Sequence, residues 1–244
     1  YVVAPDCNYD LALLRWGCQT LMWSADRLEI KDELAPKWKE ILENLVDYPV
    51  DDNGYMVGRG VPFKRSHRHY SHLFMVYPLH IVDTSIKENA DLMDKSIRQW
   101  HSWKEGLRGY SFTGGASLYA TLLRGNDALE MLDGLRKYIR PNSLYAETWP
   151  VIETPMSGAA SIHDMILQSW NNVVNVMPAV PDSWKDLVFH NLRAEGAFLV
   201  SAVRKGGKLQ WVRVKSIAGE PLRLRVDMPV EAEVQGTAAK SMRR

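Results

Sequence analysis

The chain has 244 residues, 46% hydrophobic and 24% charged, a globular composition that excludes disordered and low-complexity architectures. Thirty Lys and Arg against 29 Asp and Glu give a formal net charge of +1, so no basic excess favours nucleic acid or an anionic membrane as a partner. No apolar run is long enough to span a bilayer. The two cysteines, Cys7 and Cys18, are too few for a disulfide framework.

The first two thirds of the chain have a helical pattern. Tyr1 is followed almost directly by a helical repeat, and we expect the chain to be a piece of a longer protein. Apolar residues recur at helical spacing up to about Trp170. The predicted faces are those of Leu11, Leu14, Cys18, Leu21 and Met22; Leu34, Trp38, Ile41, Leu42 and Leu45; Met93, Ile97 and Trp100; Leu118 and Leu122; Ala128, Leu129, Leu132 and Leu135; and Ala159, Ile162, Met165 and Ile166. Trp16, Trp38 and Trp100 are predicted to lie in the core.

Local signals predict where these helices begin and end. Gly125 fits the end of one helix and Asn126 the N-cap of the next. The last helix is expected over residues 158–168. Residues 109–115 are typical of a loop before a helix. They lack the Lys-Ser/Thr ending and the preceding strand of a phosphate-binding loop.

After Asn171 the period changes to two. Residues 209–215 and 222–227 alternate as strands do, and Gly206-Gly207 and Ala218-Gly219 indicate tight turns. Helices first and strands second predict a multidomain α-then-β chain, an all-α region joined to a small antiparallel all-β domain. The Pro-rich residues 178–181 are the expected joint.

Three of the seven histidines lie within residues 66–72. If this segment is extended, His67 and His69 project to one face. Such a pair suits two metal ligands or two hydrogen-bonding groups for a polyhydroxylated ligand, and the lack of a third acidic or Cys ligand at a recognisable spacing disfavours the metal. The alternative is one buried histidine and two exposed ones without a role in binding.

A carboxylate at position 153 is the second candidate. Glu153 lies between Pro150 and Pro155, just before small residues that open a helix. The N-terminus of a helix favours an ionised carboxylate, as a general base in glycoside hydrolysis requires. The alternative is a carboxylate that only stabilises the helix dipole. Glu147 is a weaker candidate of the same kind, and Trp149 is the best candidate for stacking on a sugar.

Several motifs occur in the order found in the glycoside hydrolase family 95 α-L-fucosidases, which the chain resembles over about residues 10–225. The most specific is His67-Arg68-His69-Tyr70-Ser71-His72-Leu73-Phe74 with Tyr77-Pro78, which resembles His-Arg-His-x-Ser-His-Leu-(Phe/Tyr)…Tyr-Pro. The others are Asp10-Leu11-Ala12-Leu13-Leu14-Arg15, Gly109-Tyr110-Ser111, residues 162–169, Met177-Pro178-Ala179-Val180-Pro181-Asp182-Ser183-Trp184 and Leu192-Arg193-Ala194-Glu195-Gly196-Ala197-Phe198.

The resemblance implies the second half of an (α/α)6 toroid over residues 1–172, followed by a small β-sandwich domain over residues 173–244. It implies an inverting glycosidase whose base position is Glu153, with the general acid and the assisting asparagines upstream of Tyr1. His67, Arg68, His69, Trp149 and Thr154 would bind the sugar. No metal or organic cofactor is implied, and the family expectation is a secreted or periplasmic protein.

Some positions depart from the family. Glu153 stands where the family has Asp, Thr154-Pro155 replaces Gly-Asn, and Gly114-Gly115 stands where Trp-Lys is usual. The prediction is therefore hydrolysis of a terminal α-linked sugar from an oligosaccharide or polysaccharide by inversion, with α-L-fucose first and L-galactose next. This fragment alone is expected to be inactive.

Two other readings remain open. The altered base motif favours a catalytically silent glycan-binding relative. Arg59, Arg65 and Arg68 near the histidines suggest a polysaccharide lyase on a similar toroid, with arginine neutralising a uronate.

Overall fold

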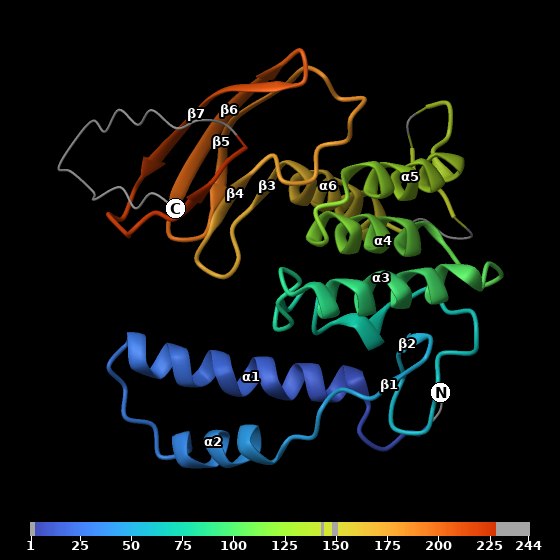
Figure 1. The fold of residues 1–244 in the computed structure, drawn as a ribbon, viewed down its shortest axis with the longest axis vertical. Coiled ribbons are helices and arrows are strands. Elements are labelled where there is room, and N and C mark those ends of the chain that lie inside the picture. Colours follow the sequence, from blue (N-terminus) through green and yellow to red (C-terminus); the bar gives the residue numbers. More distant parts are fainter. Residues whose placement is uncertain (1–2, 143, 148–150, 228–244) are drawn as a thin grey trace.

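The computed structural model describes residues 3–142, 144–147 and 151–227, and places helices first and small sheets last (Figure 1). This confirms the α-then-β order; the closed toroid and the sandwich stay predictions. The helices are α1 (Asn8–Arg27), α2 (Ala35–Asn44), α3 (Lys87–Ser102), α4 (Gly109–Thr121), α5 (Gly125–Leu135) and α6 (Glu153–Ile166), with 3-10 turns η1 (Ser71–Leu73) and η2 (Arg136–Tyr138). None of these helices is both long and apolar enough to cross a membrane.

Helices α1 and α2 pack on one another at one end of the molecule (Figure 1). Helix α1 buries Leu11, Ala12 and Cys18 but leaves Trp16 45% exposed, so the prediction that Trp16 lies in the core was wrong for the described residues. Trp38 is only half-buried. Trp100 is fully buried, which confirms the prediction that it lies in the core.

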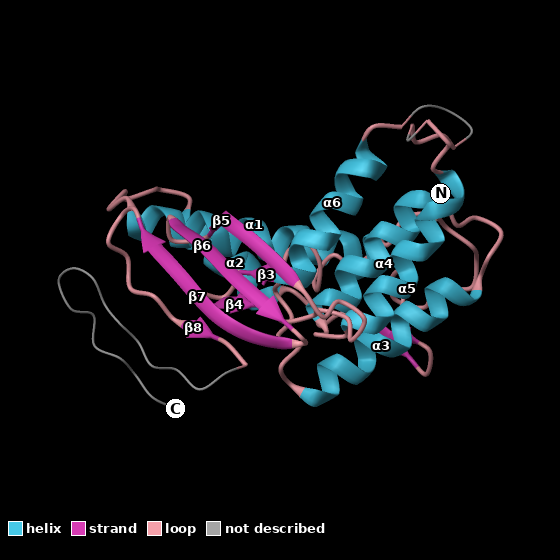
Figure 2. Ribbon diagram, turned by 90° about the horizontal axis from the view of Figure 1, so that it is seen from above, coloured by secondary structure: helices cyan, strands magenta, loops and turns pink. Residues whose placement is uncertain are grey.

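Helix α4 is the centre of the helical part, with α5 and α6 packed against it (Figure 2). Nearly all of its residues are buried, because glycine, serine and alanine let neighbouring groups approach its backbone. A Cβ on Gly114 would collide with the Tyr70 ring, and one on Gly115 would lie 2.9 Å from His101 Nε2. The expected loop over residues 109–115 was wrong, because close packing outweighs the weak helix propensity of this segment.

Two other helix starts differ from the sequence prediction. Helix α5 begins at Gly125, and Asn126 does not cap it. The Asn126 side chain instead donates to Asp182 Oδ2 at 2.8 Å and accepts from the Asp182 backbone N–H at 2.9 Å. Helix α6 begins at Glu153 rather than near residue 158. Pro155 is tolerated in its first turn, because the missing N–H of a proline is not needed there.

A short hairpin of β1 (Val50–Asp51) and β2 (Gly54–Tyr55) lies between α2 and α3. After α6, the described residues form two small sheets. One sheet has β5 (Leu187–Ala194), β6 (Phe198–Lys205) and β7 (Lys208–Ser216) in antiparallel order. Gly206 and Gly207 have positive φ between β6 and β7, as the predicted turn requires.

The other sheet has β3 (Leu167–Gln168), β4 (Val174–Val176) and β8 (Leu224–Arg225). β8 pairs with β4 in parallel, so the predicted hairpin at Ala218-Gly219 and a purely antiparallel β domain were wrong. The second expected strand, over residues 222–227, is reduced to Leu224 and Arg225 because it meets β4 instead of returning along β7.

Candidate functional site

The segment that carries His67, Arg68 and His69 is fixed through its backbone. Trp100 Nε1, from the buried face of α3, donates to the His67 carbonyl oxygen at 2.7 Å. Ser111 Oγ, in the first turn of α4, donates to the Arg68 carbonyl oxygen at 2.8 Å. Two helices therefore set the path of the segment and leave its side chains outside.

The side chains of His67, Arg68 and His69 are exposed and lie together. The two imidazole ring centroids are 5.2 Å apart, and the His69 backbone N–H donates to His67 Nδ1 at 3.1 Å. Arg68 Nε donates to His69 Nε2 at 3.2 Å. Partial burial, followed by the charges of His67 and Arg68, lowers the pKa of His69, so a neutral imidazole beside a guanidinium faces solvent.

Tyr110 also lies beside this group, although sequence motifs had not assigned it a role of its own. Its ring stands edge-on to His69 with centroids 5.8 Å apart and stacks on Tyr70 at 5.7 Å. The Tyr70 and Tyr110 hydroxyls are 3.4 Å apart. The half-buried Tyr110 ring is therefore held rigidly, next to the histidines, by a fully packed neighbour.

The predicted base, Glu153, is the first residue of α6 and is exposed. Thr154 beside it is only 1% exposed. A Cβ built on Gly109 would lie 2.9 Å from Thr154 Cγ2, so the start of α6 packs directly on the start of α4. The segment of His67–His69 and the start of α6 thus both contact the N-terminal turn of α4, which is the common element of the candidate site.

Glu147 also contacts this turn. Its Oε1 accepts the Gly109 backbone N–H at 2.7 Å and a hydrogen bond from the Tyr145 hydroxyl. These bonds make Glu147 an anchor for the segment between α5 and α6. Trp149, the predicted stacking residue, lies outside the described residues.

Behind the site, a carboxylate that no sequence motif indicates lies among tyrosines. Burial raises the pKa of Asp164 on α6 to about 6, and the hydroxyls of Ser117 and Tyr77 only partly offset this. Asp164 Oδ2 is buried and has no hydrogen-bond partner among the residues that the structure describes. The Asp164 carboxylate in turn contributes to raising the pKa values of Tyr70 and Tyr77, which are raised chiefly by burial.

Two remaining sequence hypotheses meet specific observations. Arg59, one of the arginines that suggested a lyase, forms an ion pair with Asp6 at 2.7 Å. Within the described part of the chain, no three His, Cys, Asp or Glu side chains gather as a metal site.

Comparisons with known proteins match two consecutive parts of the chain, the helical part first and the β region second. The model of the glycosyl hydrolase family 95 catalytic domain matches residues 1–166, and that of the glycoside hydrolase family 95 C-terminal domain matches residues 168–244. Alpha-L-fucosidase 2 of Arabidopsis thaliana is 28% identical over 156 residues, which cover 59% of this chain and 18% of that protein. The match therefore spans less than a fifth of the length of this curated relative.

Proposed function

Because the chain belongs to glycoside hydrolase family 95, we propose that it forms part of a glycosidase that removes a terminal α-linked sugar from a glycan by inversion. The observation that carries the proposal is the meeting of two segments at the first turn of α4. One bears His67, Arg68 and His69, and the other opens with Glu153. The name of the Arabidopsis relative supports α-L-fucose as the first sugar to test, with L-galactose next.

In this proposal Glu153 is the general base. It is the first residue of a 14-residue helix, and its exposure leaves room for a water molecule. In an inverting enzyme such a carboxylate activates water on the face of the sugar opposite the leaving group. The partner that protonates the leaving group is proposed to come from another part of the full-length polypeptide.

The neighbouring polar groups bind the sugar. His67 and His69, one of them neutral, donate to and accept from hydroxyls, and Arg68 supplies further donors. Tyr110 offers an aromatic ring next to His69 for stacking on a sugar, the role that the sequence predicts for Trp149. Thr154 is assigned to the same site as the support of Glu153, because it is 1% exposed with its methyl group packed towards Gly109. An extracellular or periplasmic location belongs to the same proposal.

The test follows product anomers by proton NMR, using the full-length polypeptide with fucosylated, galactosylated and uronate-containing oligosaccharides. We expect a β-configured sugar from an α-linked substrate, and a loss of at least 100-fold in kcat for Glu153→Gln, the scale of general acid–base catalysis. Glu130→Gln is the matched control, because Glu130 is an exposed helix carboxylate on α5. Equal kcat for Glu153→Gln and wild type would contradict the assignment of the base.

The second candidate is a silent glycan-binding relative, favoured by Glu153, Thr154 and Pro155 in place of the family's Asp-Gly-Asn. Binding of the oligosaccharides without any release would support it. Products that absorb in the ultraviolet as unsaturated uronates would instead support a polysaccharide lyase.

A further inference from the structure

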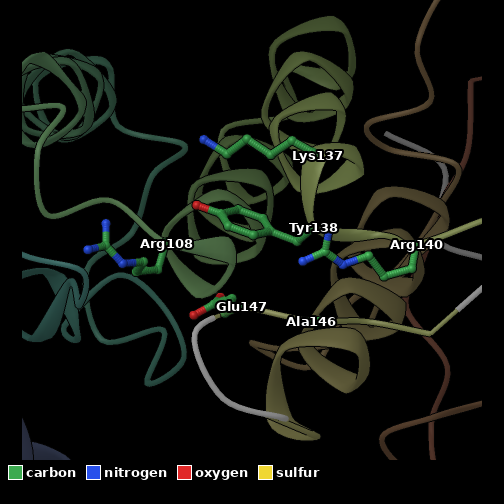
Figure 3. Close-up of a pocket in the computed structure, with 6 residues that line it drawn as sticks. All are labelled: Arg108, Lys137, Tyr138, Arg140, Ala146 and Glu147. Carbon is green, nitrogen blue, oxygen red and sulfur yellow. The ribbon is translucent and has the colours of Figure 1, made fainter.

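A pocket of about 370 Å³ opens beside the first turn of α4, and its lining is mainly basic (Figure 3). Six residues line it: Arg108, Lys137, Tyr138, Arg140, Ala146 and Glu147. Three of them carry a positive charge and one carries a negative charge. In Figure 3 the Lys137 ammonium and the Tyr138 hydroxyl point to the side on which Arg108 lies.

The cationic groups are held in place by their surroundings. Lys137 Nζ lies 4.6 Å from the centroid of the Phe112 ring and 5.0 Å from that of the Tyr138 ring, within cation–π range of both. Arg108 Nη1 donates to the carbonyl oxygens of Glu105 and Leu107 at 3.1 and 2.8 Å. Both arrangements restrain a flexible side chain before any ligand arrives, which lowers the entropic cost of binding.

The remaining wall is a short paired segment. Arg140 N–H donates to the Leu144 carbonyl oxygen at 2.9 Å, and Ala146 N–H donates to the Tyr138 carbonyl oxygen at 2.9 Å. This pairing sets the side carrying Tyr138 and Arg140 opposite the side carrying Ala146 and Glu147.

The acidic residue of the pocket is already engaged. Glu147 Oε1 accepts hydrogen bonds from the Gly109 N–H and the Tyr145 hydroxyl, so part of its charge is directed into the protein. Within the described residues, Arg108, Lys137 and Arg140 form no ion pair. Three cationic groups against one engaged carboxylate give a pocket that attracts anions.

We propose that this pocket binds an anionic group, a carboxylate or a sulfate ester, on a sugar of the glycan near the bond that is cleaved. The inference rests on the proposed glycosidase function. Glu147 connects the pocket to Gly109, and Gly109 packs on Thr154 beside Glu153, so the pocket and the proposed base flank the same turn. Guanidinium groups bind both planar carboxylates and tetrahedral sulfates through paired hydrogen bonds, and the Tyr138 hydroxyl adds a neutral donor.

The experiment measures dissociation constants by titration calorimetry for the full-length polypeptide. The ligands are one oligosaccharide in neutral, uronate-bearing and sulfate-bearing forms, with inorganic sulfate as a separate probe. We expect an anionic form to bind at least tenfold more tightly than the neutral form. The tighter of the two anionic forms identifies the group, and inorganic sulfate alone should bind more weakly than either.

The variants test whether the pocket is responsible. In Lys137→Gln/Arg140→Gln the ratio of neutral to anionic dissociation constants should fall close to one. In Arg136→Gln it should be retained, because Arg136 lies in the same 3-10 turn but pairs with Asp133 at 3.3 Å outside the pocket. A ratio near one in the wild type, or a ratio unchanged in the double variant, would overturn the proposal. Inorganic sulfate binding as tightly as the anionic glycan would also overturn it.

Hydrolysis of the same ligands separates this proposal from the glycosidase proposal. Release of sugar from the neutral form, with a wild-type ratio near one, would overturn the pocket and leave the hydrolase intact. A tenfold preference that depends on Lys137 and Arg140, with no release from any ligand, would support the pocket and overturn the hydrolase.

Discussion

Gly114 is the position at which a single methyl group is expected to disturb the support of the site. Its missing side chain leaves room for the Tyr70 ring, which stacks on Tyr110 beside His69. We expect Gly114→Ala to cost about 1–3 kcal/mol in the free energy of unfolding, the usual range for overpacking a core, measured by urea denaturation. The same substitution at Gly17, in the middle of α1 with nothing within 4 Å, should instead stabilise the protein by about 0.5–1 kcal/mol. Equal effects at both glycines would contradict this account.

Asp164 gives a prediction with a defined pH window. Burial raises the pKa of this carboxyl in the folded chain to about 6, from the ordinary value of 3.8 that applies to the unfolded chain. Between these two values the folded state holds a proton that the unfolded state has lost, so the stability contributed by Asp164 falls as pH rises from about 4 to 6. We expect Asp164→Asn to match the wild type near pH 4 and to be more stable at pH 7.5, by at most ~3 kcal/mol. Asp52→Asn, at an exposed loop carboxylate, should show no such growing difference. A constant difference between Asp164→Asn and wild type across this range would refute the prediction.

At the scale of elements, Ser111 joins α4 to the segment of His67–His69. Its hydroxyl accepts the Arg108 N–H at 3.1 Å and donates to the Arg68 carbonyl oxygen at 2.8 Å. We expect Ser111→Ala to lower the free energy of unfolding by about 1–3 kcal/mol, because the Arg108 N–H and the Arg68 carbonyl oxygen each lose a hydrogen bond in a water-poor site. Hydrogen exchange should show faster exchange of the amides around residues 67–70. Ser102→Ala, which removes a bond at the exposed end of α3, serves as the control and should leave that exchange unchanged.

The elements also show how far sequence reasoning reached. The positions of α1, α2, α3 and β7 were predicted because their apolar residues repeat with a clear period. The second half of helix α4 was predicted from Leu118 and Leu122, whereas its first half was missed because the Gly, Ser and Thr residues there have weak helix propensity and become helical only under the neighbours that cover them. Motifs made Glu153 and His67–His69 candidates for the site, and their roles stay predictions. The pocket of Arg108, Lys137 and Arg140 and the group around Asp164 were not indicated by motifs, since their members meet only through the fold.

For the whole molecule, the buried His72 and His101 and the half-buried His80 should dominate the response to acid. Burial lowers the pKa of His72 to about 3 and those of His80 and His101 to about 4. The unfolded chain therefore binds more protons than the folded chain below about pH 6.5, and stability falls as pH falls. Between pH 7 and pH 5 the titration of Asp164 offsets only part of the loss caused by the histidines. We expect the free energy of unfolding to fall by a net amount on the order of 4 kcal/mol. Urea denaturation at pH 7, 6 and 5 measures it; constant or rising stability would contradict the prediction.

The segment bearing His67, Arg68 and His69 is held by its carbonyl oxygens, and the donors come from Trp100 and Ser111 outside it. Within the segment itself, the His67 side chain adds one bond to the backbone, from the His69 N–H to His67 Nδ1, so the path of the chain depends mainly on the two outside donors. Such a segment is open to diversification: residues 67–69 can be randomised together while the scaffold is retained. A library at these three positions should keep most members folded, and selection for new sugars can proceed there without a matching search for stabilising changes elsewhere.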